Sequence, residues 1–234
     1  MNSGLIKNLS NEIRSSPDVP HLINCVWALS NLAATDVSIR DAIVKADPNL
    51  FVALHGLLEI STSDYQLQGE VMYFISNMFT HKKIWYDQFK DSYTYAVELT
   101  AVCLHNFDFH NPQNYSEDTG VRILEPEADQ YLLNITKTFG ILVDLELATT
   151  KGADPHWVHH PSQRLDQVIN EYKLFLPLMR ILELSQNSKL IELTWKIIGF
   201  LCSCKYSTNN VEHLVDNNWL NVIKLAQITL ASQK

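Results

Sequence analysis

Glycine and proline are scarce in this sequence, with seven and eight among 234 residues. An all-β domain needs many tight turns built from these two residues, so the composition argues against a sandwich or barrel. No apolar run approaches the ~20 residues needed to cross a bilayer. Lys and Arg number 18 against 26 Asp and Glu, and a net charge of −8 disfavours a phosphate backbone as a ligand. We therefore expect no membrane insertion and no nucleic-acid binding.

Cysteine is also sparse, with four residues at positions 25, 103, 202 and 204. Three of them fall within apolar helical patterns, and Cys202 and Cys204 are too close together to suggest a disulfide framework or to make a zinc site. The first residues lack the basic and then apolar order of a secretory signal. The sequence therefore predicts a reduced, intracellular setting.

Short motifs of the common enzyme classes are missing as well. There is no Gly-rich phosphate loop, no Gly-x-Ser-x-Gly elbow and no His-Glu-x-x-His. Asp144 and Glu146 form a conceivable carboxylate pair, but the sequence places no nucleophile beside them. His156, His159 and His160 are close enough to bind a metal ion, yet their spacing fits no standard motif and flanking prolines favour an exposed loop. We predict no catalytic activity, no cofactor and no metal site.

Apolar residues recur at helical spacing through most of the chain. The pattern predicts about ten or eleven helices and no convincing strand. In the first third we expect a helix over 4–16, a more apolar one over 19–34, a short one capped by Asp36 or Ser38 and ending at Ala46, and longer ones over 50–60 and 66–81. The fold class that follows is all-α.

An internal repeat links two of these predicted helices. Residues 25–32 read Cys-Val-Trp-Ala-Leu-Ser-Asn-Leu, and residues 71–78 read Val-Met-Tyr-Phe-Ile-Ser-Asn-Met. The aromatic positions are 46 residues apart, and so are the two asparagines; armadillo and HEAT arrays repeat every ~40–47 residues. Ring and amide are four residues apart, hence one turn apart on one helix face. Such a face suits an extended peptide, because the ring packs on an aliphatic stem and the amide bonds the backbone.

The repeat recurs more weakly further along the chain. Residues 136–142 align with 195–201, and the spacing between repeats exceeds the standard period. Two polar segments, 106–128 and 149–163, account for the excess as inserted surface loops. We read residues 1–234 as a single repeat domain of four to five units.

Residues 25–58 resemble one armadillo repeat, most closely of the importin-α (karyopherin-α) kind. The resemblance rests on Trp-Ala-Leu-Ser-Asn at 27–31 followed by Ala-Ile-Val-Lys-Ala-Asp-Pro at 42–48. It implies an armadillo-type right-handed superhelix, an α-solenoid. In that family, ladders of Trp and Asn line a concave groove for nuclear localisation signals. The Trp rings sandwich lysine stems, and the Asn amides hold the peptide backbone.

On this resemblance the peptide-binding residues are Trp27, Asn31, Tyr73, Asn77 and Trp195. Only Trp27 and Asn31 match both ladder positions. Tyr73 stands where the family has Trp, and Gly199 stands where the family has the Asn that follows Trp195. The implied function is non-catalytic capture of a basic, extended peptide in nuclear import, in the cytoplasm or nucleus or both.

Two alternatives stay open at this point. The aromatic residues can equally be core residues, and the asparagines can tie neighbouring repeats together. The family's basic N-terminal arm is also missing, because residues 1–16 contain only Lys7 and Arg14. The rival interpretation is therefore a structural subunit of a larger assembly, with a degenerate groove and with the insertions carrying its contacts.

Overall fold

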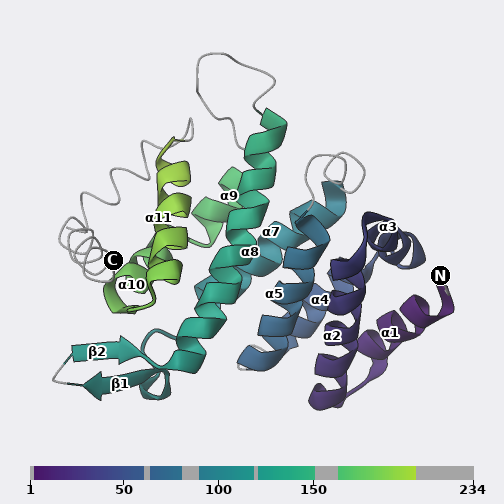
Figure 1. Ribbon diagram of the computed structural model, residues 1–234, viewed down its shortest axis with the longest axis horizontal. Helices are drawn as coiled ribbons and strands as arrows, with labels where there is room; N and C mark the ends of the chain where they lie inside the picture. Colours follow the sequence, from purple (N-terminus) through teal and green to yellow (C-terminus); the bar gives the residue numbers. More distant parts are fainter. Residues whose placement is uncertain (1–2, 61–63, 81–89, 119–120, 151–162, 204–234) are drawn as a thin grey trace.

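The computed structural model describes residues 3–60, 64–80, 90–118, 121–150 and 163–203 (Figure 1). This part of the chain is mostly helical, as the sequence predicts. Its helices are α1 (Ser3–Ser15), α2 (Val19–Thr35), α3 (Val37–Ala46), α4 (Leu50–Ile60), α5 (Tyr65–Phe79), α7 (Lys90–Asn106), α8 (Pro126–Thr150), α9 (Gln163–Glu171), α10 (Phe175–Leu184) and α11 (Ser188–Ser203). A 3-10 turn, η1 (Pro112–Asn114), and the strands β1 (Tyr115–Asp118) and β2 (Val121–Leu124) lie between α7 and α8.

Local sequence explains where several helices begin. The predicted cap Asp36 starts α3, and its carboxylate accepts a hydrogen bond from the Ser38 backbone N–H at 2.7 Å. Asp64 caps α5 in the same way, accepting from the Leu67 N–H at 2.9 Å. Pro20 lies in the first turn of α2, where a missing N–H costs nothing.

Four helices lie side by side in chain order and form a row: α5 packs on α2, α8 on α5, and α11 on α8 (Figure 1). Outside the row, α1 packs on α2, α7 on α4 and α8, and α10 on α11. The core lies between the row and these helices. Phe51 of α4 is typical of it, because its ring lies 5.9 Å from the rings of both Phe74 and Phe79 of α5.

Polar side chains also join neighbouring helices of the row. The Asn77 amide of α5 donates to the backbone oxygen of Ser30 in α2 at 3.2 Å and to the Ser30 hydroxyl at 3.0 Å. The Thr138 hydroxyl of α8 lies 3.0 Å from the backbone oxygen of Met72 in α5 and donates to it. Hydrogen bonds of this kind fix how one helix sits along the next.

The first predicted insertion, 106–128, is not simply a loop. Strands β1 and β2 form an antiparallel hairpin in which Tyr115 pairs with Leu124, so the prediction of no strand is wrong here. Both of these side chains are buried, and the Tyr115 hydroxyl donates to the Phe109 backbone oxygen at 2.6 Å. The hairpin forms because packing and hydrogen bonding at its base anchor a short strand pair that is marginal alone. Helix α8 also begins inside this segment, at Pro126.

The second predicted insertion, 149–163, lies mostly outside the described residues. Helix α8 continues to Thr150 and α9 begins at Gln163. The histidines at 156, 159 and 160 fall between them, and Cys204 falls beyond α11, so the structure describes none of these four. In the part that it does describe, no helix combines the length and the apolar character required to cross a membrane.

Candidate functional site

Each of three row helices exposes one line of side chains at three- and four-residue spacing, opposite its buried side. We call these lines together the ladder face. Its members, exposed or partly exposed, are Asn24, Trp27 and Asn31 of α2, Gln66, Glu70, Tyr73 and Asn77 of α5, and Glu127, Gln130, Asn134 and Lys137 of α8.

The predicted aromatic positions of the first two units lie open on the surface. Trp27 is 53% exposed and Tyr73 is 42% exposed, while most large hydrophobic side chains in the described residues are buried. Asn31 is exposed and makes no hydrogen bond within the described residues. A large exposed aromatic side chain is informative because the hydrophobic effect favours its burial. Neither ring is therefore a core residue of this chain.

Asn77 lies differently, because its amide N–H groups are directed to Ser30 of the neighbouring helix. Of the two roles that the sequence left open for this residue, the geometry supports the tie between repeats.

Asn77→Ala is expected to lower the free energy of unfolding by about 1 kcal/mol, because it removes the hydrogen bonds to Ser30 and leaves that hydroxyl without its donor. Urea unfolding followed by circular dichroism measures the change. The matched control is Asn31→Ala, the equivalent position on α2, for which we expect less than about 0.5 kcal/mol. Equal losses in the two variants would show that the tie contributes nothing.

Trp195 is only partly exposed and packs against the core. Its indole nitrogen is buried and has no hydrogen-bond partner within the described residues. The exposed positions beside it are Glu192 and Lys196, which form an ion pair at 2.9 Å. Trp195 thus presents less of its ring than Trp27 does.

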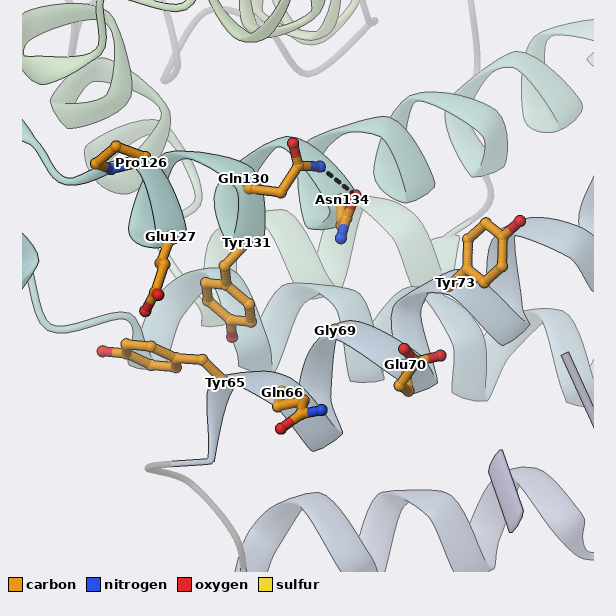
Figure 2. Close-up of a pocket in the computed structure, with 10 residues that line it drawn as sticks. All are labelled: Tyr65, Gln66, Gly69, Glu70, Tyr73, Pro126, Glu127, Gln130, Tyr131 and Asn134. Atoms are coloured by element: carbon orange, nitrogen blue, oxygen red, sulfur yellow. Dashed lines mark hydrogen bonds between the residues drawn. The ribbon is translucent and has the colours of Figure 1, made fainter. Parts of the chain in front are cut away.

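A cleft of about 590 Å³ lies between α5 and α8 on the ladder face (Figure 2). Its walls combine aromatic rings, carboxylates and amides; they are Tyr65, Tyr73, Tyr131, Glu70, Glu127, Gln66, Gln130 and Asn134, with Gly69 and Pro126. The Gln130 amide donates to the Asn134 side-chain oxygen at 3.0 Å. Rings and anions together suit a ligand with an apolar stem and a cationic end.

Glu70 is the side chain in this cleft whose hydrogen bonding is least complete. One of its carboxylate oxygens is buried and has no hydrogen-bond partner within the described residues. Burial raises the pKa of this carboxyl above its ordinary value, because desolvation disfavours the charged form. A donor that entered the cleft and paired with Glu70 would relieve that cost.

The end of the cleft near the hairpin is built from stacked rings. Tyr65 stacks on Tyr131 at 4.7 Å and on Phe107 at 5.5 Å between ring centroids. The Tyr131 hydroxyl donates to the Gln68 side-chain oxygen, and burial raises the pKa of Tyr131 well above its ordinary value. This phenol stays neutral, and the cluster holds α5, α8 and the end of α7 together.

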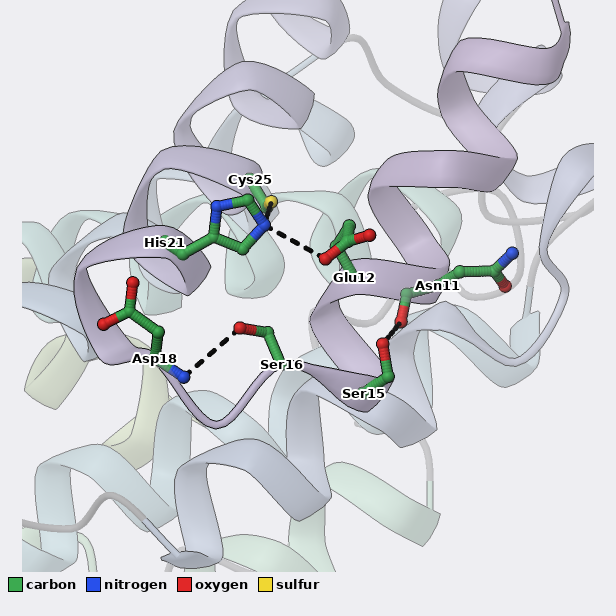
Figure 3. A network of polar contacts seen from close by, with 7 residues as sticks. All are labelled: Asn11, Glu12, Ser15, Ser16, Asp18, His21 and Cys25. Carbon is green, nitrogen blue, oxygen red and sulfur yellow. Dashed lines mark hydrogen bonds and ion pairs between the residues drawn. The ribbon is translucent and has the colours of Figure 1, made fainter.

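A thiol, an imidazole and a carboxylate also meet between α1 and α2 (Figure 3). The His21 Nε2 atom lies 3.6 Å from Cys25 Sγ and 3.1 Å from Glu12 Oε2. A histidine that activates a nucleophile uses opposite ring nitrogens for the nucleophile and the carboxylate, whereas one nitrogen faces both groups here. Burial, with a smaller effect of the Glu12 charge, raises the pKa of the Cys25 thiol. The geometry favours a contact between helices.

The carboxylate pair considered from the sequence does not face one site, since Asp144 is exposed while Glu146 is buried. Within the described ranges, no three or more His, Cys, Asp or Glu side chains gather closely enough to hold a metal ion.

Sequence reasoning missed the contribution of α8 to the ladder face. The repeat alignment placed Thr136 at the aromatic position, but Thr136 is fully buried. The exposed residues are Gln130 and Lys137 instead, with Asn134 partly exposed between them. Their spacing of four and three residues, polar throughout, was the available signal for the outward side of this helix.

Comparisons with known proteins yield little for this chain. No protein-family model matches it, and no curated protein matches it. Among solved structures it is similar to the crystal structure of an engineered protein, at 14% sequence identity and a TM-score of 0.45, with 97% of each chain covered.

Proposed function

We propose that this chain is a non-catalytic, armadillo-type α-solenoid that captures an extended, basic segment of a partner protein along the ladder face. The observation that carries the proposal is the pair of exposed rings, Trp27 and Tyr73, at equivalent places on adjacent helices. The cleft beside Tyr73, with the unpartnered Glu70 oxygen, supports a cationic ligand. By the resemblance to importin-α, the segment is similar to a nuclear localisation signal and the setting is protein import into the nucleus.

In the proposed complex, each ring packs on the aliphatic stem of a Lys or Arg and makes a cation–π contact worth about 0.5–2 kcal/mol. The Asn31 amide exchanges hydrogen bonds with the peptide backbone in place of water. A third basic side chain enters the cleft and donates to Glu70, with Glu127 nearby on α8.

The spacing of the row helices limits which basic residues of one peptide can contact Trp27 and Tyr73 at the same time. Packed helix axes lie about 8–10 Å apart, and an extended chain rises about 3.3 Å per residue. Trp27 and Tyr73 would therefore address side chains roughly two or three residues apart in the peptide. A cluster of consecutive basic residues satisfies this spacing.

The rival interpretation, a structural subunit of a larger assembly, is supported by the anchored hairpin. The described part of that insertion contacts α10.

The same part of the insertion leaves Trp27 and Tyr73 exposed, however. An open ladder face supports peptide capture rather than a groove filled by the insertion. Purification from the native source separates the two, because a stable stoichiometric complex favours the subunit and a free monomer favours peptide capture.

Glu70→Gln is expected to weaken binding of an acetylated, amidated Lys-Lys-Arg-Lys peptide about tenfold, since a charge-assisted hydrogen bond is worth about 1.5–3 kcal/mol. Affinity for the unaltered chain should rise with pH through the raised pKa of Glu70, because the cation binds the carboxylate and releases its proton. The variant should lose this dependence. Calorimetric titration between pH 4.5 and 7.5, chosen to span ordinary and raised carboxyl pKa values, measures both effects.

The control peptide for this titration carries methionine at each basic position, which keeps length and apolar stem but removes charge. It should not bind measurably. Equal affinity for both peptides, or an unchanged pH profile in Glu70→Gln, would remove Glu70 from the site.

A further inference from the structure

A second cavity, of about 240 Å³, lies away from the ladder face, where the end of α7 meets the start of α10. Its lining is cationic and apolar, with Lys173 and Arg180 beside Phe109 and Leu176, and with Asp108 as its acidic member. Leu176 is 45% exposed. No member of the ladder face lines this cavity.

Lys173 reaches this cavity from an unfavourable backbone conformation. It has a φ of 48°, the left-handed region in which a side chain is strained and glycine is the usual residue. The Leu174 N–H bonds the Ile169 backbone oxygen at 3.1 Å, which is the hydrogen bond that closes a helix with a left-handed residue. A lysine in this conformation lowers the stability of the fold, and strained residues of this kind are common at binding sites.

Hydrogen bonds from neighbouring segments hold the walls in place. His105 Nδ1 lies 2.9 Å from the Tyr172 backbone oxygen, to which it donates, and this fixes the turn that carries Lys173. On the other wall, the Asn114 amide donates to the Asp108 backbone oxygen at 2.9 Å. The cavity is therefore built by the α9–α10 turn and by the hairpin base together.

The charges in the lining favour an anion. The Lys173 ammonium group has no ion pair or hydrogen bond within the described residues. Arg180 contacts Glu183 at 2.5 Å, and both side chains are about one third exposed, so this ion pair is a weak one. The Asp108 carboxylate already accepts the His110 backbone N–H at 2.8 Å. The lining holds two basic side chains against one carboxylate, in a chain of net charge −8.

The size of the cavity decides what kind of ligand fits it. Sites for drug-sized molecules enclose about 300–1,000 Å³, and this cavity is smaller, so it suits one amino-acid side chain. We propose that it binds an acidic segment of a partner polypeptide, with one apolar side chain between Phe109 and Leu176 and flanking carboxylates on Lys173 and Arg180. This site is independent of the basic-peptide site.

Lys173→Gly is the sharpest test, because it should move stability and binding in opposite directions. Glycine relaxes the positive φ, so the midpoint of thermal unfolding should rise. The variant should bind an acetylated, amidated Ser-Asp-Glu-Phe-Asp-Ser peptide about tenfold more weakly than the unaltered chain does, measured by calorimetric titration. Lys7→Glu, an exposed charge reversal on α1, should leave the affinity unchanged.

Two further peptides test the two halves of the ligand. Replacing Phe by Ser, or the acidic residues by their amides, should each abolish measurable binding. The proposal is overturned if the acidic peptide does not bind, if Lys173→Gly retains full affinity, or if Lys7→Glu weakens binding as much as Lys173→Gly does.

Discussion

Replacing both Trp27 and Tyr73 by alanine is expected to weaken binding of the Lys-Lys-Arg-Lys peptide by roughly 5- to 1,000-fold, because each ring contributes about 0.5–2 kcal/mol and both contacts are lost. The loss should appear mainly in the dissociation rate, since the charges that steer association remain. Calorimetry gives the affinity, and surface plasmon resonance gives the rates.

The double variant should fold as the unaltered chain does. Trp27 and Tyr73 are 53% and 42% exposed, so their truncation removes less buried area than truncation of a core ring would. Val52→Ala is the matched control, because Val52 is a 44% exposed apolar residue on α4, outside the ladder face. Should the double variant bind the peptide as well as Val52→Ala does, the ladder face is not the binding site.

Phe51→Ala is expected to lower the free energy of unfolding by about 3–5 kcal/mol, the usual cost of deleting a buried ring. Phe51 is almost fully buried, and its ring contacts those of Phe74 and Phe79. These two residues lie on the inner side of α5, the helix that carries Tyr73. Chemical denaturation gives the change, and the peptide titration shows whether a loosened α5 also lowers affinity.

Phe51→Leu serves as the graded control for Phe51→Ala. It keeps most of the buried volume, so we expect a clearly smaller loss than with alanine. The core assignment would fail if both substitutions cost less than about 1 kcal/mol, because an exposed ring would be removed at that cost.

Helices α2, α3 and α5 could be predicted well because their signals are local. The 46-residue spacing of Trp27 and Tyr73, the Asp36 cap and the apolar periodicity depend only on neighbouring residues. Helix geometry placed Trp27 and Asn31 on one helix face, whereas a surface shared with Tyr73 was expected only from the resemblance.

The outward side of α8 could not be predicted in the same way. Its alignment relied on small residues, Thr136 and Gly140, that fit either side of a helix, and burial shows Thr136 to point inward. The hairpin depends on contacts between segments far apart in the sequence, such as β2 with α10 and the stacking of Tyr65 on Phe107. The cleft at Glu70 needs α5 and α8 placed together, which no single stretch of sequence specifies.

The hydrogen bonds from Asn77 to Ser30 have a mechanical consequence for recognition. They oppose sliding of α5 along α2, so the rings of Trp27 and Tyr73 should keep a constant separation in the proposed complex. The chain would then select peptides by the spacing between their basic side chains. Removing these hydrogen bonds should allow peptides with a wider range of spacings between basic residues to bind. The affinity for any one of these peptides should fall less.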